Sequence, residues 1–459
     1  MADTRRRADP MTATEQRATF ALAGIYAARM LGLFLIFPVF ALYAEHLSGA
    51  TPLLVGVAVG AYGLTQALLQ IPFGMVSDRL GRKPVIVFGL LLFALGSVIA
   101  ALGTDVWTVI LGRALQGAGA VAGVVMALLA DLTREAQRTK AMATIGMTIG
   151  LSFSVALVAG PLLDELWGVS GIFWLVAAFA VGSIGLLLWA VPTPERSVVH
   201  RDAEVVSGQL GAVLRNGELL RLDFGIFALH MVMTSLFLAV PLLLRDAAGL
   251  ETVDHWKVYL PALTLSVAAM IPLIVLAERR GRMKGVFLGA IALVLVAQLG
   301  LNALAGSALA IAAWLFVFFA GFNVLEATLP SLVSKIAPAA AKGTAMGMYA
   351  TAQFAGAFVG GGLAHQHYGL AGVFTFGVVA CAAWLGVAGA MRRPGHFSRR
   401  LLPVGALSES AAEALAVRLL AVPGVVEAVV VADEGVAYLK VDVARLDEGA
   451  LDAFGPAGA

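Results

Sequence analysis

Residues 74–85 read GMVSDRLGRKPV, and this short stretch decides how the rest of the chain is interpreted. It places four charged side chains, Asp78, Arg79, Arg82 and Lys83, between two long apolar runs. The whole chain is 60% hydrophobic and only 13% charged, whereas a soluble domain carries about 25% charged residues. Most of the chain therefore cannot face water, and the charged stretch is a polar connection between two apolar segments.

Apolar runs follow one another along most of the chain. Each is about 20 residues long, which is enough to cross ~30 Å of hydrocarbon. Inside a bilayer every backbone polar group must be satisfied within the protein, so long apolar runs form helices. Barrel strands are about half as long and alternate in polarity. We therefore predict an all-α polytopic membrane protein with twelve transmembrane helices. The expected spans are 18–45, 52–76, 84–103, 106–130, 140–163, 168–191, 222–244, 256–277, 285–305, 308–333, 343–364 and 369–391.

The basic residues predict the orientation of these spans. Most of the 31 Lys and Arg lie in the N-terminal segment or in connections on the same side of the membrane as that segment. The opposite side carries Arg245 and Lys257, diluted by nearby acids. The positive-inside rule then places both termini in the cytoplasm, as expected for a multi-pass protein of a bacterial inner membrane. The net charge of +2 is an orientation signal and gives no reason to expect nucleic acid as a partner.

The chain is built from two similar halves, offset by about 200 residues. Residues 24–30 (GIYAARM) align with 225–231 (GIFALHM), and residues 78–82 (DRLGR) align with 278–282 (ERRGR). Parallel six-span repeats with a site at their junction are a transporter architecture. We expect an N-terminal half at 1–191, a cytoplasmic linker at 192–221, a C-terminal half at 222–391 and a cytoplasmic tail at 392–459.

Several of these residues carry a family resemblance. Residues 74–84 resemble the signature loop between the second and third helices of the major facilitator superfamily. Residues 113–117 (RALQG) resemble its fourth-helix motif. Residues 29–39 and 131–140 are similar to the YajR-type drug-exporter group of that superfamily. The glycines and proline that resemble its fifth-helix antiporter motif are Gly146, Gly150, Gly160 and Pro161, although Leu162 and Leu163 replace the usual glycine after the proline. The resemblance implies two pseudo-symmetric six-helix halves that exchange access to a central site.

The tail has a different composition. Ser408 or Ser410 can cap a helix that continues to about Leu420, and two β-rich runs, 425–431 and 436–443, flank a hairpin turn. Residues 447–454 favour a second short helix. We expect a small α+β unit from about residue 403, and in the resembling group such a tail is a ferredoxin-like cytoplasmic domain. Its role is either stabilising or regulatory.

The charged stretch is interpreted as a conformational latch. Gly81 permits a tight turn, and Gly74 allows close approach of a neighbouring helix. Asp78 can accept hydrogen bonds from the start of an adjacent helix, which the resemblance identifies as the eleventh. Arg82 is then expected to pair with Asp131 at the end of the fourth helix. Contacts made in one conformation bias alternating access; the alternative is that these charges only set topology.

Ionisable groups inside the spans are candidates for binding and releasing protons. Placing one at a helix centre costs ~2.5–3.5 kcal/mol, so such groups face a cavity or each other. Glu326 is the one acid that the sequence places well inside a span, and burial disfavours its charged form. We consider Glu326, Arg113 and His230 candidates for proton coupling. The alternative is structural: Glu326 pairs with Arg29, Arg113 or His230 between helices.

Other polar or small residues inside spans are candidates for the cavity and for bending. The cavity and substrate candidates are Arg29, Gln66, Gln70, Gln116, Asn323 and Gln353. Gly150, Gly160 and Pro161 form a candidate hinge in the fifth helix, because proline removes a backbone donor. Glycine pairs at GxxxG spacing, at 56/60, 119/123, 146/150 and 356/360, favour close helix packing.

Three functions remain open. The first is a proton-coupled antiporter that exports small amphipathic or drug-like compounds by alternating access. The second is a proton-coupled importer of a polar metabolite, and the third is a membrane sensor that signals through its tail. No nucleophile elbow or Walker loop supports an enzyme or an ATP-driven pump. The single cysteine, Cys381, excludes disulfides and cysteine-based metal sites. We expect no cofactor or metal and, beyond the bilayer, a monomer whose partners are protons and a small molecule.

Overall fold

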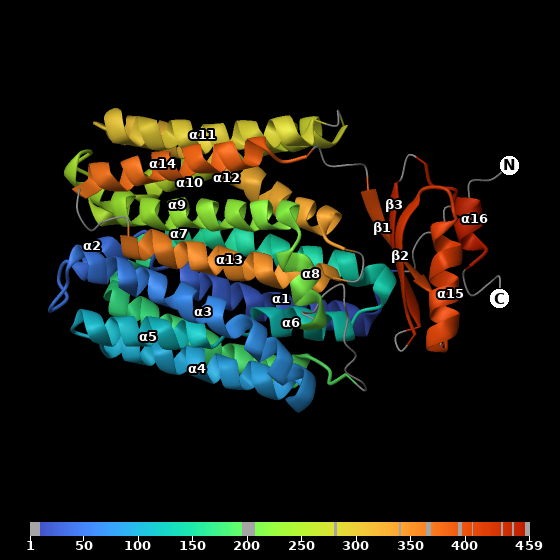
Figure 1. The fold of residues 1–459 in the computed structure, drawn as a ribbon. Helices are drawn as coiled ribbons and strands as arrows, with labels where there is room; N and C mark the ends of the chain where they lie inside the picture. The colour runs from blue at the N-terminus through green and yellow to red at the C-terminus, as the bar shows by residue number, and fades with distance from the viewer. Residues whose placement is uncertain are drawn as a thin grey trace.

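The computed structural model describes residues 10–194, 207–279, 282–338, 341–363, 369–392, 397–405, 407–432, 435–442 and 445–454. A bundle of long helices lies beside a small sheet-containing domain, which covers one end of the bundle (Figure 1). We call this end the tail end and the opposite one the far end. The N-terminal half contains α1 (Ala13–Phe34), α2 (Phe40–Ala44), α3 (Pro52–Leu80), α4 (Arg82–Leu102), α5 (Val106–Ala118), α6 (Ala122–Asp131) and α7 (Glu135–Ala190).

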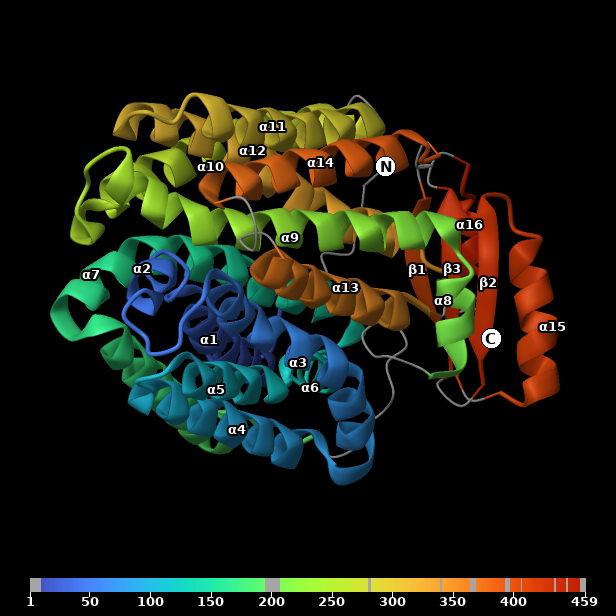
Figure 2. The same ribbon diagram turned by 60° about the vertical axis from the view of Figure 1, so that its left-hand side comes forward.

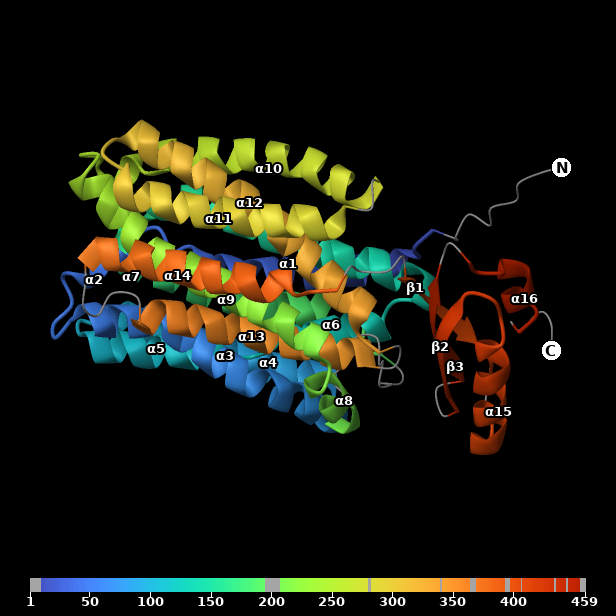
Figure 3. The same ribbon diagram turned by 45° about the horizontal axis from the view of Figure 1, so that its top comes forward.

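The C-terminal half repeats this order. It contains α8 (Leu210–Leu214), α9 (Gly217–Asp246), α10 (Trp256–Arg279), α11 (Met283–Ala303), α12 (Ala308–Ile336), α13 (Lys342–Leu363) and α14 (Gly369–Gly389). Figure 3 shows α10, α11 and α12 on one side of the bundle and α3, α4 and α5 on the other. The second copy of the charged stretch includes residues 280 and 281, which lie outside the described residues.

Helix is present in all twelve expected spans, with three differences in continuity. The first span is α1 followed by α2, with turns between them at Leu35–Val39. The fourth span is interrupted between α5 and α6. The fifth and sixth spans run together as α7, which breaks at Gly168, where φ is +65°. This positive φ favours glycine, and Figure 2 shows α7 curving at the far end of the bundle.

Length and composition agree with a membrane protein. Among the described residues, nine helices are long and apolar enough to cross a membrane, and one of them, Lys140–Ala190, is long enough for two crossings. Helices α1 and α13 coincide with the two remaining expected spans but carry more polar side chains. Side-chain caps mark several helix starts: the Asp105 carboxylate accepts from the backbone of α5, and Ser307 does so for α12.

The two halves touch most closely where α3 packs on α13 (Figure 2). A Cβ atom at Gly56 would lie 1.8 Å from the Gly361 carbonyl oxygen, and one at Gly60 would lie 2.8 Å from that of Phe358. Gly356 meets the backbone of Phe227 in α9 at a similar distance. The GxxxG pairs at 56/60 and 356/360 therefore pack helices as predicted. The pair at 146/150 does not, since a Cβ at either glycine meets nothing within 4 Å.

The tail forms a small α+β domain with an element that the sequence did not reveal. Its elements are β1 (Phe397–Pro403), α15 (Glu409–Leu420), β2 (Val425–Val431), β3 (Val436–Asp442) and α16 (Glu448–Asp452). The antiparallel sheet has the order β1-β3-β2, so the described elements follow the first five of a ferredoxin-like βαββαβ unit. Strand β1 begins before residue 403, because FSRRLLP lacks clear alternation and its pairing with β3 depends on tertiary contact.

The sheet lies between the bundle and helices α15 and α16 (Figure 1). Ser408 caps α15, its side chain accepting from the Ala411 N–H. Lys440 in β3 donates its Nζ proton to the Ile336 carbonyl at 3.3 Å. Because that carbonyl ends α12, the tail domain contacts a helix that carries central polar residues.

Candidate functional site

The charged stretch forms a buried ion network at the tail end of the N-terminal half. Gly81, with φ of +90°, separates α3 from α4. Arg82 is 3% exposed; its guanidinium pairs with Asp78, and its Nε lies 3.3 Å from Asp131 Oδ2. It also donates to Ser77 Oγ at 2.7 Å. One guanidinium thus ties together the ends of α3 and α6 and the start of α4.

Two parts of the latch prediction turn out differently. A Cβ at Gly74 would meet nothing within 4 Å, so no helix approaches that glycine in this conformation. Asp78 pairs with Arg82, four residues later, across the break between α3 and α4. Its predicted contact with the start of the eleventh span is absent from the contacts of the described residues, and residues 339 and 340, just before that span, lie outside them.

Two buried arginines of the N-terminal half are surrounded by amides and aromatic rings. Arg29 donates to Gln66, and its guanidinium lies 5.9 Å from the ring centres of both Tyr62 and Phe93. Arg113 is fully buried, donates to Gln116 at 2.6 Å and lies 5.1 Å from the Tyr62 ring. Ring faces and amide oxygens therefore take the place of carboxylates.

Hydrogen bonds extend from Arg29 across to the other half. Gln66 donates to Gln70 at 3.3 Å, and Gln70 donates to the Gly347 carbonyl of α13 at 3.2 Å. Gln116 instead donates to Ser97 at 2.8 Å, which keeps the Arg113 network within the N-terminal half. The structure thus separates Arg113 from Glu326, although the sequence proposed both for proton coupling.

The C-terminal half brings His230, Glu326 and Gln353 together from α9, α12 and α13. His230 Nε2 lies 2.7 Å from Gln353 Nε2 and 3.5 Å from Glu326 Oε1. The amide nitrogen of Gln353 is a donor, so in this arrangement His230 Nε2 accepts and is unprotonated. Glu326 Oε1 is buried without a hydrogen-bond partner.

Asn323 lies one turn before Glu326 and donates to Ser266 of α10 at 3.0 Å. It therefore links α12 to α10 and does not join the His230 group. The candidate hinge in α7 is split in the same way. A Cβ at Gly160 would lie 2.6 Å from the Leu35 carbonyl oxygen, so Gly160 packs against the α1–α2 connection. Its neighbour Pro161 is buried, whereas Gly150 is exposed.

Sequence reasoning did not single out Asp223, a buried acid of α9. It lies in the second turn of α9, is 8% exposed, and its Oδ1 has no hydrogen-bond partner. The sequence placed it at the edge of the seventh span, where acids are usually solvated. Its spacing of seven residues from His230, two helical turns, was the available signal.

Aromatic side chains from both halves meet on the far-end side of this group. Phe153 of α7 contacts Phe237 of α9 at 5.9 Å and Phe322 of α12 at 6.1 Å between ring centres. Beyond them, Arg245 forms an ion pair with Glu45 at 2.6 Å, joining α9 to the residue after α2. The aromatic contacts and this ion pair therefore connect the two halves between His230 and the far end.

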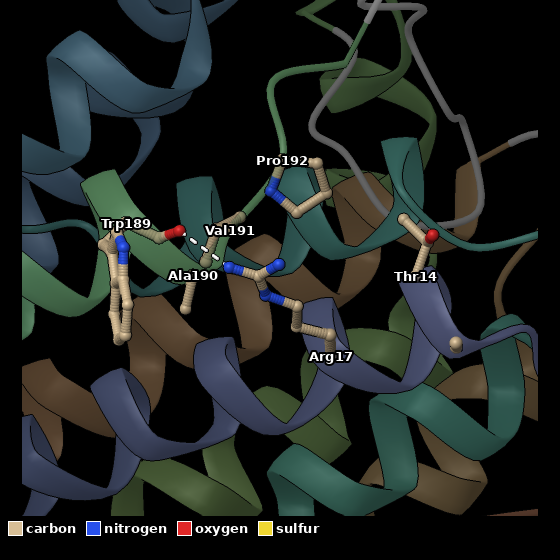
Figure 4. Close-up of a pocket in the computed structure, with 7 residues that line it drawn as sticks. Thr14, Arg17, Trp189, Ala190, Val191 and Pro192 are labelled. Atoms are coloured by element: carbon tan, nitrogen blue, oxygen red, sulfur yellow. Dashed lines mark hydrogen bonds between the residues drawn. The ribbon is translucent and has the colours of Figure 1, made fainter.

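A separate surface pocket lies at the tail end, between the start of α1 and the end of α7 (Figure 4). Arg17 in this pocket donates to the Trp189 carbonyl at 2.9 Å. The pocket contains none of the predicted site residues, so it is distinct from the central polar groups. Among the described residues, no three His, Cys, Asp or Glu side chains gather as metal ligands.

Comparison with known proteins defines the class. Residues 22–361 match the Major Facilitator Superfamily, and residues 404–445 match the YajR YAM domain. The chain therefore belongs to the Major Facilitator Superfamily and is a membrane transporter, because that family consists of transporters rather than enzymes.

Its relatives include named transporters. It is 45% identical over 435 residues to the inner membrane transport protein YajR of Escherichia coli K12, covering 94% of this chain and 95% of that protein. It is 32% identical over 352 residues to an uncharacterized transporter of Buchnera aphidicola, covering 76% and 90% of the two chains. It is 28% identical over 327 residues to the multidrug resistance protein MdtH of Klebsiella pneumoniae, covering 69% and 78%.

Solved structures show the same fold. A bacterial homolog of the human lysosomal transporter Spinster, in an inward-facing and occupied conformation, matches with a TM-score of 0.66 at 13% identity, covering 83% of this chain and 98% of that one. The human organic anion transporter MFSD10 (TETRAN) matches with a TM-score of 0.59 at 20% identity, covering 82% and 98%.

Proposed function

We propose that this transporter is a proton-coupled antiporter that exports small amphipathic or drug-like compounds and works as a monomer. The observation that carries the proposal is the Glu326–His230 pair, with 3.5 Å between Oε1 and Nε2. A carboxyl and an imidazole at this distance can exchange a proton after a small movement. The likeness to MdtH, whose name describes multidrug resistance, supports the substrate class.

The conformation agrees with such a cycle. The aromatic contacts around Phe153 and the Arg245–Glu45 ion pair join the halves on the far-end side of Glu326. Glu326 itself keeps 32% of its side chain exposed, although it lies ten residues from the end of α12. The bias of basic residues assigns the tail end to the cytoplasm. We therefore interpret this state as closed to the outside and accessible from the inside.

The latch has a defined part in this cycle. Asp78, Arg82 and Asp131 hold α3, α4 and α6 as one unit at the cytoplasmic end. Movement of the N-terminal half against α13 then proceeds by sliding along Gly56 and Gly60, where only glycine permits the observed approach. Breaking the network would let the three helices move separately.

The test uses proteoliposomes with an imposed pH gradient and two lipophilic cations, ethidium and tetraphenylphosphonium. Glu326→Gln is expected to lower gradient-driven transport about a hundredfold while binding of the cations persists. Glu251→Gln, an exposed residue with the same substitution, serves as the matched control. Full gradient-driven transport by Glu326→Gln would refute proton coupling through this residue.

The second candidate, import of a polar metabolite with protons, gains support from Asp223. The sequence placed one acid, Glu326, well inside a span, and Asp223 adds a second acid that is buried in the bundle. Gradient-driven accumulation of a polar solute, together with no flux of either lipophilic cation, would favour import over export.

A further inference from the structure

The surface pocket between the start of α1 and the end of α7 has a volume of about 280 Å³. Pockets for drug-sized ligands span about 300–1,000 Å³, so this one suits a smaller group. The residues that line it are Ala13, Thr14, Arg17, Trp189, Ala190, Val191 and Pro192. One of these side chains is basic and none is acidic, so the pocket favours an anionic group.

Arg17 retains donors for such a group. Figure 4 shows its side chain reaching from α1 toward the end of α7, where one N–H donates to the Trp189 carbonyl at 2.9 Å. A guanidinium has five N–H donors, and the described residues supply no carboxylate partner for Arg17. The acid two residues earlier, Glu15, is already paired with Arg134 at 2.9 Å. The charge of Arg17 is therefore free to bind an anion.

Further donors surround the pocket. Lys83 at the start of α4 donates to the Val191 carbonyl at 2.5 Å, which adds a second positive charge beside the pocket wall. Ala13 and Thr14 begin α1, and the first N–H groups of a helix have no carbonyl partner within it. Phosphate groups bind where cations and such backbone donors combine. The pocket therefore suits a phosphate.

The pocket also lies at the level where the spans leave the membrane. Arg17 directly precedes the first expected span, 18–45, and Trp189 is near the end of the sixth, 168–191. Trp189 is 85% exposed, and Phe20, about one turn deeper on α1, is 68% exposed. Exposed tryptophans are typical of the lipid headgroup level. The phosphate that reaches this pocket is therefore expected to be part of a lipid.

The outer surface of α7 leaves room for an acyl chain below this level. Gly185 and Gly182 lie about one and two turns deeper than Trp189 on the same face. Both glycines are exposed, and a Cβ atom at either would meet nothing within 4 Å. A chain that starts at the pocket can therefore lie against the helix without displacing a side chain.

We propose that this pocket binds the phosphate of an anionic glycerophospholipid from the tail-end leaflet. Arg17 holds the phosphate, Trp189 packs beside the headgroup, and one acyl chain follows Gly185 and Gly182. Basic groups near a membrane surface attract anionic lipids. The lining residues all belong to the N-terminal half and its end, so the site does not depend on the proposed proton coupling or on the transported compound.

Native mass spectrometry of the full chain, purified in detergent and freed of lipid, measures the affinity. The probes are phosphatidylglycerol and phosphatidylcholine with the same acyl chains. We expect wild type to prefer phosphatidylglycerol and Arg17→Gln to bind it about tenfold more weakly, because a charged hydrogen bond is lost. Arg79→Gln, an exposed arginine at the same end, is the matched control. Equal phosphatidylglycerol affinities of wild type and Arg17→Gln would refute the site.

Protection of an introduced thiol locates the lipid without altering Arg17. The native Cys381 is buried, so Thr14→Cys adds one accessible thiol to the pocket. Phosphatidylglycerol should slow its reaction with a maleimide, while the thiol of Ser410→Cys, exposed in the tail domain, should keep its rate. An unchanged rate at Thr14→Cys would place the lipid elsewhere and overturn the proposal. Equal protection by glycerol 1-phosphate at the same concentration would assign the pocket to a soluble phosphate compound and overturn the lipid assignment.

Discussion

Arg29 in the N-terminal half and His230 in the C-terminal half occupy equivalent positions of the repeat, in α1 and α9, yet their surroundings differ. Arg29 is a permanent cation held by an amide and two aromatic rings. His230 can gain or lose a proton and lies near a carboxyl group. Other ionisable groups inside the bundle show the same contrast. In the N-terminal half, the described contacts of Arg113 are with Gln116 and Tyr62. The acids Asp223 and Glu326 lie in the C-terminal half.

The two halves of this duplicated fold differ in whether the charges of their central side chains can change. In the N-terminal half the charges of the buried Arg29 and Arg113 do not change, because guanidinium groups remain protonated in proteins, and the buried acids Glu15 and Asp131 lie near the tail end. The C-terminal half contains groups whose charge can change, His230, Glu326 and Asp223. A proton can therefore alter the electrostatics of one half while the other stays constant. Gln70 and its hydrogen bond to Gly347 connect the two.

The largest expected effect concerns the latch, which differs between the halves. Arg82 is buried between Asp78 and Asp131, whereas its repeat equivalent Arg282 is exposed. Arg82→Ala should lower the free energy of unfolding by about 3–5 kcal/mol, because it removes one partner of the buried Arg82–Asp131 ion pair. Arg282→Ala should change it by less than about 0.5 kcal/mol. Unfolding in mixed detergent micelles, followed by tryptophan fluorescence, measures both changes in free energy. Equal changes would show that Arg82 contributes no more to stability than Arg282.

An intermediate effect is expected when the C-terminal half is made to resemble the N-terminal half. His230→Arg would place a permanent cation beside Glu326 and keep the carboxylate ionised, lowering gradient-driven ethidium flux about tenfold or more. His230→Gln, which keeps a hydrogen-bonding side chain without the charge, should have a smaller effect. Proteoliposome flux assays compare the two variants. Undiminished flux in His230→Arg would show that a titratable group at this position is not needed.

The smallest expected effect involves Glu15, which precedes the first expected span. Its carboxylate receives Arg134 N–H donors at 2.9 and 3.0 Å, and these hydrogen bonds lower the pKa of Glu15 from 4.5 to about 2. The resulting stability is present above pH 4.5 and is lost as the pH falls through 2. Glu15→Gln should therefore cost about 1 kcal/mol at neutral pH, with the difference from wild type shrinking below pH 4.5.

Unfolding at a series of pH values measures this difference. Glu218→Gln in the C-terminal half is the comparison, because Glu218 forms a local pair with Arg221 three residues away. Such helix pairs contribute about 0.3–0.5 kcal/mol. A pH-independent cost of Glu15→Gln would mean that its effect comes from lost packing and not from charge.

Several features were predictable because they depend on residues close in the sequence. Apolar runs of membrane-spanning length lead to helices wherever backbone groups must be satisfied internally. The Arg82–Asp131 contact was predicted from the signature stretch and is confirmed at 3.3 Å. The sequence suggested Arg29, Arg113 or His230 as the partner of Glu326, and in the structure His230 lies beside it. Strand β1 escaped prediction because its stability comes from pairing with β3, more than thirty residues away.

By itself, the sequence determined the class of protein, its repeated halves, the charged stretch at 74–85 and the presence of an acid inside the tenth span, because composition, periodicity and local motifs express these directly. Only the tertiary structure decided which groups share an environment. It buried Asp223 and grouped Glu326 with His230, while Arg113 contacts Gln116. The physical reason is that the cost of a charge depends on the neighbouring helices that exclude water from it, and those neighbours come from distant parts of the chain.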